Sequence, residues 1–138
     1  AHPNADKIQH LNRLKGLGAE FSTVMVGEVY HRSFDNRRQL GSYVGLAGSP
    51  FQSGASAREQ GITKAGNAKA RTTMIELAWV WLRHQPDSAL SRWFRTRTAN
   101  AGKRAKRVAI VALARKLIVA LWRYLTTGLI PEQATMKA

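Results

Sequence analysis

Apolar residues recur at helical spacing along most of the chain, and no run alternates convincingly between apolar and polar residues as a strand does. The clearest stretch covers residues 67–84, where the apolar positions share one helix face at Met74, Leu77, Ala78, Trp81 and Leu82. Residues 103–127 are apolar almost all round in their middle, which predicts a long helix at the centre of the core. The pattern therefore predicts a small all-α domain.

Caps and breakers mark further helix ends. Asp35 is expected to cap a third helix over residues 36–44. Either Asp87 or Ser88 is expected to cap the helix that precedes the long one. Gly128 is expected to end the long helix, because glycine adopts the left-handed conformation found at helix C-termini.

Two short helices are predicted over residues 5–15 and 19–30, joined by the turn Lys15-Gly16-Leu17-Gly18. The two glycines permit a tight turn and a close approach of the backbone, and the N–H groups that open the second helix favour an anion. Residues 5–30 thus look like a helix-hairpin-helix whose Lys15, Gly16 and Gly18 contact a DNA phosphate without reading sequence. The alternative is a helical hairpin in which the glycines only make the turn.

The charge of the chain is strongly lopsided. Its 138 residues carry 22 lysines and arginines against 8 acids, a formal net charge of +14. Such an excess concerns partners rather than fold, with nucleic acid as the first candidate and an anionic membrane surface as the second. The most apolar stretch, from Val108 to Trp122, is too short to span a hydrocarbon core of about 30 Å. The absence of cysteine excludes zinc ribbons, thiol catalysis and a disulfide scaffold.

One run of sixteen residues holds seven cations and no acid. The seven are Arg92, Arg95, Arg97, Lys103, Arg104, Lys106 and Arg107. We expect this run to contact nucleic-acid phosphates with an affinity that falls steeply with salt. The alternative is a solvated helix face, although such faces usually mix both signs. Trp79, Trp81, Trp93 and Trp122 have helical spacing that favours core positions over base stacking.

Residues 45–66 are rich in glycine and serine and predict an irregular loop. Ser53 and Ser56 lie in this loop, with cations nearby in the sequence at Arg58, Lys64, Lys69 and Arg71. A serine hydroxyl that attacks phosphorus needs an exposed seat and cations that stabilise the charge of the transition state. The alternative, which composition alone favours, is a flexible basic loop whose serines cap turns.

No metal site is expected within this chain. The four histidines are scattered, and no pair has ligand spacing on a helix. The eight carboxylates are equally dispersed, whereas a two-metal nuclease centre needs clustered acids. We therefore expect no cofactor in this chain.

An ordered series of short motifs, from about Lys7 to Leu129, resembles a known family. The motifs are Leu14-Lys15-Gly16-Leu17-Gly18, Arg32-Ser33-Phe34-Asp35-Asn36, Tyr43-Val44-Gly45-Leu46, Ser53-Gly54, Gly61-Ile62-Thr63-Lys64-Ala65-Gly66-Asn67, Arg71 and Glu76-Leu77-Ala78-Trp79. Together they are similar to the C-terminal domain of the insertion-sequence one-ten family of bacterial transposases, the DEDD-type, bridge-RNA-guided serine recombinases. The ordered series is far more specific than any one motif.

The resemblance implies that Ser53 becomes covalently linked to DNA, with Ser56 as the fallback. From the loop motif and the basic composition we expect Arg58, Lys64 and Arg71 to act as phosphate clamps beside it. It also implies an N-terminal RNase-H-like domain whose four acids bind magnesium, a guide RNA and a homo-oligomer. That domain has no counterpart here, so we expect residues 1–138 to be a fragment that is inactive alone. We expect the parent protein in the bacterial cytoplasm at the nucleoid, with no membrane partner.

Three sub-parts follow from these patterns: a helix-hairpin-helix over residues 5–30, a serine loop over 45–66 and a helical core over 67–127. The main hypothesis is DNA strand transfer. Two alternatives stay open, a non-catalytic module that grips nucleic acid or joins protomers, and an inactive transposon remnant.

Overall fold

The computed structural model describes residues 3–46 and 67–138, and within them it contains six α-helices, one π-helical segment and no strand. The α-helices are α1 (Pro3–Asn12), α2 (Ala19–Met25), α3 (Arg37–Val44), α5 (Ala68–His84), α6 (Ala89–Thr98) and α7 (Lys103–Thr127). The π-helical segment η1 (Val26–Tyr30) continues α2 directly. The predicted all-α class is confirmed.

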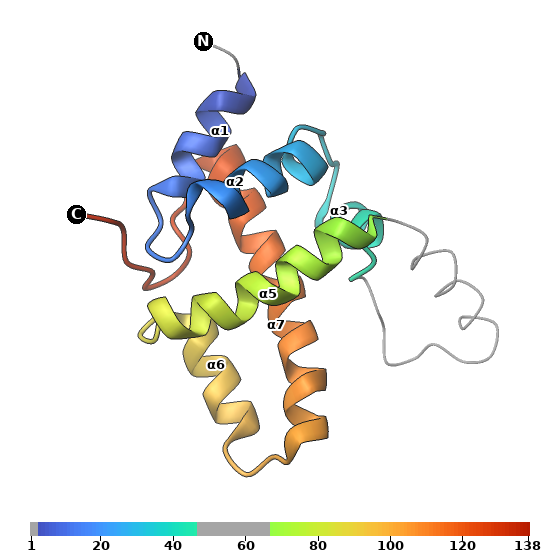
Figure 1. The fold of residues 1–138 in the computed structure, drawn as a ribbon, viewed down its shortest axis with the longest axis vertical. Helices are drawn as coiled ribbons and strands as arrows, with labels where there is room; N and C mark the ends of the chain where they lie inside the picture. Colours follow the sequence, from blue (N-terminus) through green and yellow to red (C-terminus); the bar gives the residue numbers. More distant parts are fainter. Residues whose placement is uncertain (1–2, 47–66) are drawn as a thin grey trace, which may run out of the picture.

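Helix α7 runs through the middle of the molecule, with α5 crossing it and α6 beside its N-terminal half (Figure 1). Its buried side chains are Ala109, Ile110, Leu113, Ala114, Leu117, Ile118, Leu121 and Tyr124. The buried side of α5 contains the predicted Met74, Leu77, Ala78 and Trp81. Because full burial of a large apolar side chain contributes about 1.5–3 kcal/mol, these two helices supply much of the core. The central position predicted for the last helix is confirmed.

Several helix ends follow the predicted caps. Ser88, not Asp87, caps α6, and its Oγ accepts from the N–H of Ser91 at 3.2 Å and from Nε1 of Trp81 at 2.9 Å. Gly128 ends α7 in the left-handed conformation, with φ of 78°. A buried cap that also receives an indole N–H ties the end of α5 to the start of α6, because both donors would otherwise lack a partner.

Two predicted boundaries are wrong. Asp35 does not cap α3; the cap is Asn36, whose Oδ1 accepts from the N–H of Gln39 at 2.9 Å. Gln39 in turn reaches back, and its Oε1 accepts from the N–H of Asp35 at 2.8 Å, so the two flanking residues share a reciprocal cap. Helix α1 ends at Asn12 rather than at residue 15, because Leu14 pairs with Met136 in an isolated β-bridge.

Two buried tyrosines connect the N-terminal helices to α7. The hydroxyl of Tyr30 donates to the carbonyl of Ile118, and that of Tyr124 donates to the carbonyl of His10, each at 2.8 Å. Burial raises the pKa of the Tyr30 hydroxyl well above its ordinary value of 10.0. Burial also raises the pKa of Tyr124, against the opposing charge of Arg13.

The C-terminal segment, residues 129–138, folds back onto the turn between α1 and α2 (Figure 1). Gln85, only 1% exposed, joins the two: its Nε2 donates to the carbonyls of Lys15 and Thr135, both at 2.8 Å. Its Oε1 accepts from the N–H of Thr135 at 2.7 Å. The turn is therefore built into the domain by contacts far apart in the sequence.

Candidate nucleic-acid interface

The α6–α7 hairpin carries the predicted run of cations. Figure 1 shows this hairpin projecting from the body of the molecule, with α6 and the N-terminal half of α7 side by side. All seven cations are exposed: Arg92, Arg95, Arg97, Lys103, Arg104, Lys106 and Arg107. Residues 103–108 are all exposed as well, so α7 begins beyond the core. We call these seven residues the basic arm. The sequence contains no aspartate or glutamate between Ser88 and Pro131, so no acid is close to the arm along the chain.

The tryptophans near the arm differ in burial. Trp81 is fully buried, as predicted, and Trp93 is half-buried with the guanidinium of Arg97 over its ring at 5.6 Å. Trp79, predicted to lie in the core, is 44% exposed and meets Phe94 edge to face with ring centroids 6.0 Å apart. The core interpretation is wrong for Trp79, which packs against Phe94 of α6 but keeps nearly half of its surface exposed.

The turn between α1 and α2 is occupied by the protein itself. Gly16 has a left-handed φ of +95°, and a Cβ built there would lie 2.8 Å from the Cβ of His84. The backbone of Lys15 is used on both sides, by the carbonyl of Thr135 and the amide of Gln85. The requirement for glycine at position 16 is thus explained by internal packing, while the side chain of Lys15 remains exposed.

Gly18 caps α2 with φ of −93°, and a Cβ there would meet nothing within 4 Å. The first turn of α2 contains Glu20, whose carboxylate is favoured by the positive end of the helix. Because the Glu20 carboxylate and a phosphate are both negative, the carboxylate disfavours phosphate binding at this helix end. Phosphate contact at the hairpin therefore stays a prediction that rests on the sequence pattern.

A cluster of hydrogen bonds joins α3, α5 and η1. The amide Nδ2 of Asn67 donates to the carbonyl of Glu28 at 3.2 Å and to its carboxylate Oε1 at 3.1 Å. The hydroxyl of Tyr43 donates to the same carbonyl at 3.0 Å, and the N–H of Asn67 donates to the carbonyl of Tyr43 at 3.1 Å. We call Glu28, Tyr43 and Asn67 the polar clamp. It brings Tyr43 and Asn67 together, although 23 residues separate them in the sequence.

Only some of the residues predicted for the serine chemistry are among those that the structure describes. Ser53, Ser56, Arg58 and Lys64 lie outside the described residues. Lys69 is exposed and Arg71 is half-buried, both near the N-terminus of α5. In the ranges 3–46 and 67–138 no group of three or more histidines or acids is placed to hold a metal ion.

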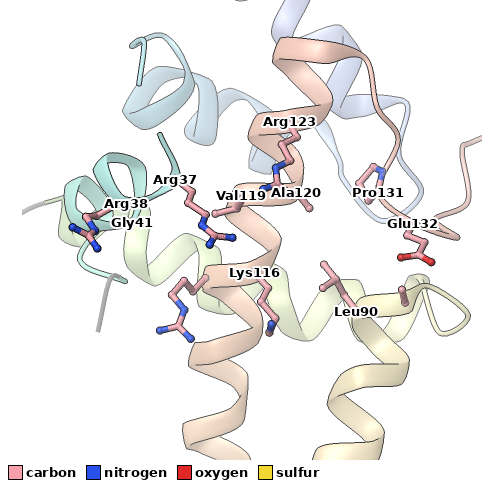
Figure 2. A pocket seen from close by; sticks show the side chains of 12 residues that line it. Arg37, Arg38, Gly41, Leu90, Lys116, Val119, Ala120, Arg123, Pro131 and Glu132 are labelled. Atoms are coloured by element: carbon pink, nitrogen blue, oxygen red, sulfur yellow. The ribbon is translucent and has the colours of Figure 1, made fainter. Parts of the chain in front are cut away.

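The structure also brings together cations that the sequence pattern did not single out. They line a groove between α3, α7 and the C-terminal segment, and they are Arg37, Arg38, Arg115, Lys116 and Arg123 (Figure 2). These cations are far apart in the sequence, so local patterns do not reveal the cluster, which forms only because α3 and α7 pack together in the fold. The sequence alone could have indicated part of this groove, because Lys116 and Arg123 are seven residues apart and so share one face of the long apolar helix.

Comparison with known proteins places the chain. A family model described as "Transposase IS116/IS110/IS902 family" matches residues 8–92. The chain belongs to this transposase family. It is 54% identical over 125 residues to the "Putative transposase y4rJ" of Sinorhizobium fredii, a match that covers 90% of this chain and 32% of that protein.

Two further relatives agree with this assignment. The "Transposase for insertion sequence element IS1111A" of Coxiella burnetii is 30% identical over 128 residues, which cover 91% of this chain and 34% of the relative. The "Putative transposase y4qE" of Sinorhizobium fredii is 34% identical over 95 residues, which cover 68% of this chain and 24% of the relative. The transposase domain thus spans about a third of the length of the curated relatives, or less. No solved structure matches it. None of the helices in its described part is long and apolar enough to cross a bilayer.

Proposed function

We propose that this transposase domain binds DNA during the movement of an insertion sequence and supplies the serine nucleophile for strand transfer. The observation that carries the proposal is family membership combined with a projecting arm of seven exposed cations. Arginine and lysine on such a surface bind phosphates by charge and release counterions, without reading bases. DNA is thus the partner that both the family and the surface support.

In the proposed reaction, the hydroxyl of Ser53 attacks a DNA phosphodiester. An Oγ–phosphorus bond forms while a phosphorus–oxygen bond to deoxyribose breaks. The serine hydroxyl loses its proton, and the released sugar oxygen gains one, so the proton count balances. The motif Ser53-Gly54 followed by Gly61-Ile62-Thr63-Lys64 supports this role through family resemblance, with Ser56 as the fallback. Arg58, Lys64 and Arg71 are the proposed cations that offset the charge of the transition state. The magnesium-binding acids, the guide RNA, the homo-oligomer and the location at the bacterial nucleoid belong to the proposal for the parent protein.

Trapping the covalent intermediate tests the nucleophile. In the complete transposase that carries this chain, Ser53→Ala should abolish both strand transfer and the protein–DNA adduct on a nicked suicide substrate. Its DNA affinity should stay within about twofold, because a single hydroxyl contributes little beside seven cations. Ser49→Ala is the matched control and should leave both readouts unchanged.

A second candidate function is a non-catalytic module that only grips nucleic acid, and the basic arm supports it without any chemistry. Loss of the adduct in Ser56→Ala but not in Ser53→Ala would move the nucleophile to the fallback serine. Normal adduct formation by both variants would leave the module as the function of this domain.

A further inference from the structure

A groove with a cavity volume of about 600 Å³ lies between α3, α6, α7 and the C-terminal segment (Figure 2). Its charged lining consists of Arg37, Arg38, Arg115, Lys116, Arg123 and Glu132. None of the seven arm cations contributes to this lining. Five cations against one carboxylate make the groove strongly electropositive, and its volume is of the size that holds a small organic ligand, about 300–1,000 Å³.

One face of α7 forms the floor of the groove. Lys116, Val119, Ala120 and Arg123 follow one another at i, i+3, i+4 and i+7, which places them in a single stripe. Lys116 and Arg123 are about 10 Å apart along the helix axis, since seven residues rise about 1.5 Å each. The two small apolar side chains between them are half-buried and line the groove together with Leu90 of α6 (Figure 2). The floor therefore alternates cation, apolar surface and cation.

The cations occupy positions that folding alone does not favour. Arg37 and Arg38 stand in the first turn of α3, where the positive end of the helix opposes positive side chains. The first turn itself contains no acid, and Asp35, just before the helix, is the nearest one along the chain. Both arginines are exposed, so neither is needed to fill the core. Lys116 is held with its ammonium group 4.8 Å from the ring centroid of Trp93, which restricts where its charge points. A ligand of opposite charge would offset the unfavourable electrostatics of this arrangement.

We propose that this groove binds the sugar–phosphate backbone of an unpaired nucleic-acid strand, through cations other than those of the basic arm. A single strand alternates charged phosphates with sugar and base faces, which matches the alternation along the floor. A duplex presents its phosphates on a convex surface and keeps its bases stacked inside, so it cannot fill a concave site of this size. The inference rests on the proposed DNA-handling function and deepens it, because strand transfer exposes unpaired ends.

Glu132 sets one limit of the site. Its carboxylate lies at the edge of the groove opposite α3, and its carbonyl accepts from the N–H of Ala89 at 3.1 Å, which anchors the residue to α6 (Figure 2). Because a carboxylate repels phosphate, we expect the strand to follow the cations of α3 and α7 and to leave before Glu132. Removing that charge in Glu132→Gln should raise affinity for a single strand about twofold to threefold.

Binding to short oligonucleotides tests the proposal. The probes are fluorescein-labelled dT12, rU12 and a 12-base-pair DNA duplex, measured with the 138-residue chain by fluorescence anisotropy. The Arg37→Ala/Arg123→Ala double variant should lose about tenfold in affinity for a single strand and less than twofold for the duplex. Its salt slope on dT12 should shrink by roughly 1.4, the value for two lost phosphate contacts on a single strand. The ratio of rU12 to dT12 affinity identifies RNA or DNA as the source of the strand.

The control is Arg13→Ala/Arg83→Ala, which removes two exposed cations outside the groove and the arm and so matches the change in net charge. It should leave the preference between single strand and duplex unchanged, and circular dichroism should show both double variants folded. Groove variants that bind dT12 as the wild type does, or that lose the duplex to the same extent, overturn the proposal. In that event, weaker duplex binding by arm variants would still support the proposed DNA-binding function. If neither the groove variants nor the arm variants bind nucleic acid more weakly, both the groove proposal and the proposed DNA-binding function are wrong.

Discussion

Gly16 combines a positive φ of +95° with a site where an added methyl group would lie 2.8 Å from the Cβ of His84. Both features oppose any other residue, so Gly16→Ala should lower the free energy of unfolding by about 1–3 kcal/mol, measured by urea titration. Gly27→Ala is the control, because a Cβ there meets nothing within 4 Å and alanine favours helix. Unchanged stability together with weaker DNA binding by Gly16→Ala would instead assign the glycine to a phosphate contact.

Because of Tyr30, we expect the free energy of unfolding to fall as the pH rises above 10. Burial raises the pKa of its hydroxyl in the folded chain above 10.0, so its contribution is complete below pH 10. As pH rises from 10 toward the folded pKa, the unfolded chain releases this proton first, and the free energy of unfolding falls by up to about 1.4 kcal/mol per pH unit. The Tyr30→Phe variant should have a free energy of unfolding about 1 kcal/mol lower than the wild type at pH 7. Above pH 10 its free energy of unfolding should fall less steeply than that of the wild type. Urea unfolding of both proteins from pH 8 to 11 measures this, and parallel curves would contradict it.

The polar clamp acts at the level of elements, because Asn67 both caps α5 and holds η1. Asn67→Asp keeps the cap on the N–H of Ala70, since aspartate caps helices as well as asparagine. It removes the amide donor and sets a second carboxylate beside Glu28, so we expect a loss of about 1–3 kcal/mol in the free energy of unfolding. In a Glu28→Gln background the same change should cost much less, because the repulsion is gone. Additive losses in this double-mutant cycle would mean that the two side chains do not interact.

The elements themselves were largely predictable from the sequence, whereas their meeting points were not. The faces of α5 and α7 depend on local periodicity, and Met74, Leu77 and Trp81 are buried as that periodicity predicts. Helix α1 stops early because of a distant partner, Met136, which no local pattern can reveal. The groove could not be predicted for the same reason, since it forms only when cations of α3 and α7 come together in the fold.

The net charge of +14 makes salt act in opposite directions on folding and on binding. Screening reduces self-repulsion, so raising sodium chloride from about 50 to 200 mM should raise the Tm of the domain by roughly 2–4 °C. The same change should weaken duplex DNA binding, because each phosphate contact releases counterions. If about four arm cations contact phosphates, log affinity should fall against log salt with a slope of about −3.6, which is roughly a 100-fold loss over this range.

An arm variant separates the two effects. Replacing Lys103, Arg104, Lys106 and Arg107 by alanine removes exposed charges at the start of α7 without touching the core. The salt slope of duplex binding should then become less negative by up to about 3.6, the value for four lost phosphate contacts. The Tm should respond less to salt because self-repulsion is smaller. The Arg13→Ala/Arg83→Ala control should keep the wild-type slope for the duplex. An arm variant with an unchanged slope would place the DNA contact elsewhere on the molecule, since the slope counts phosphates neutralised rather than total charge.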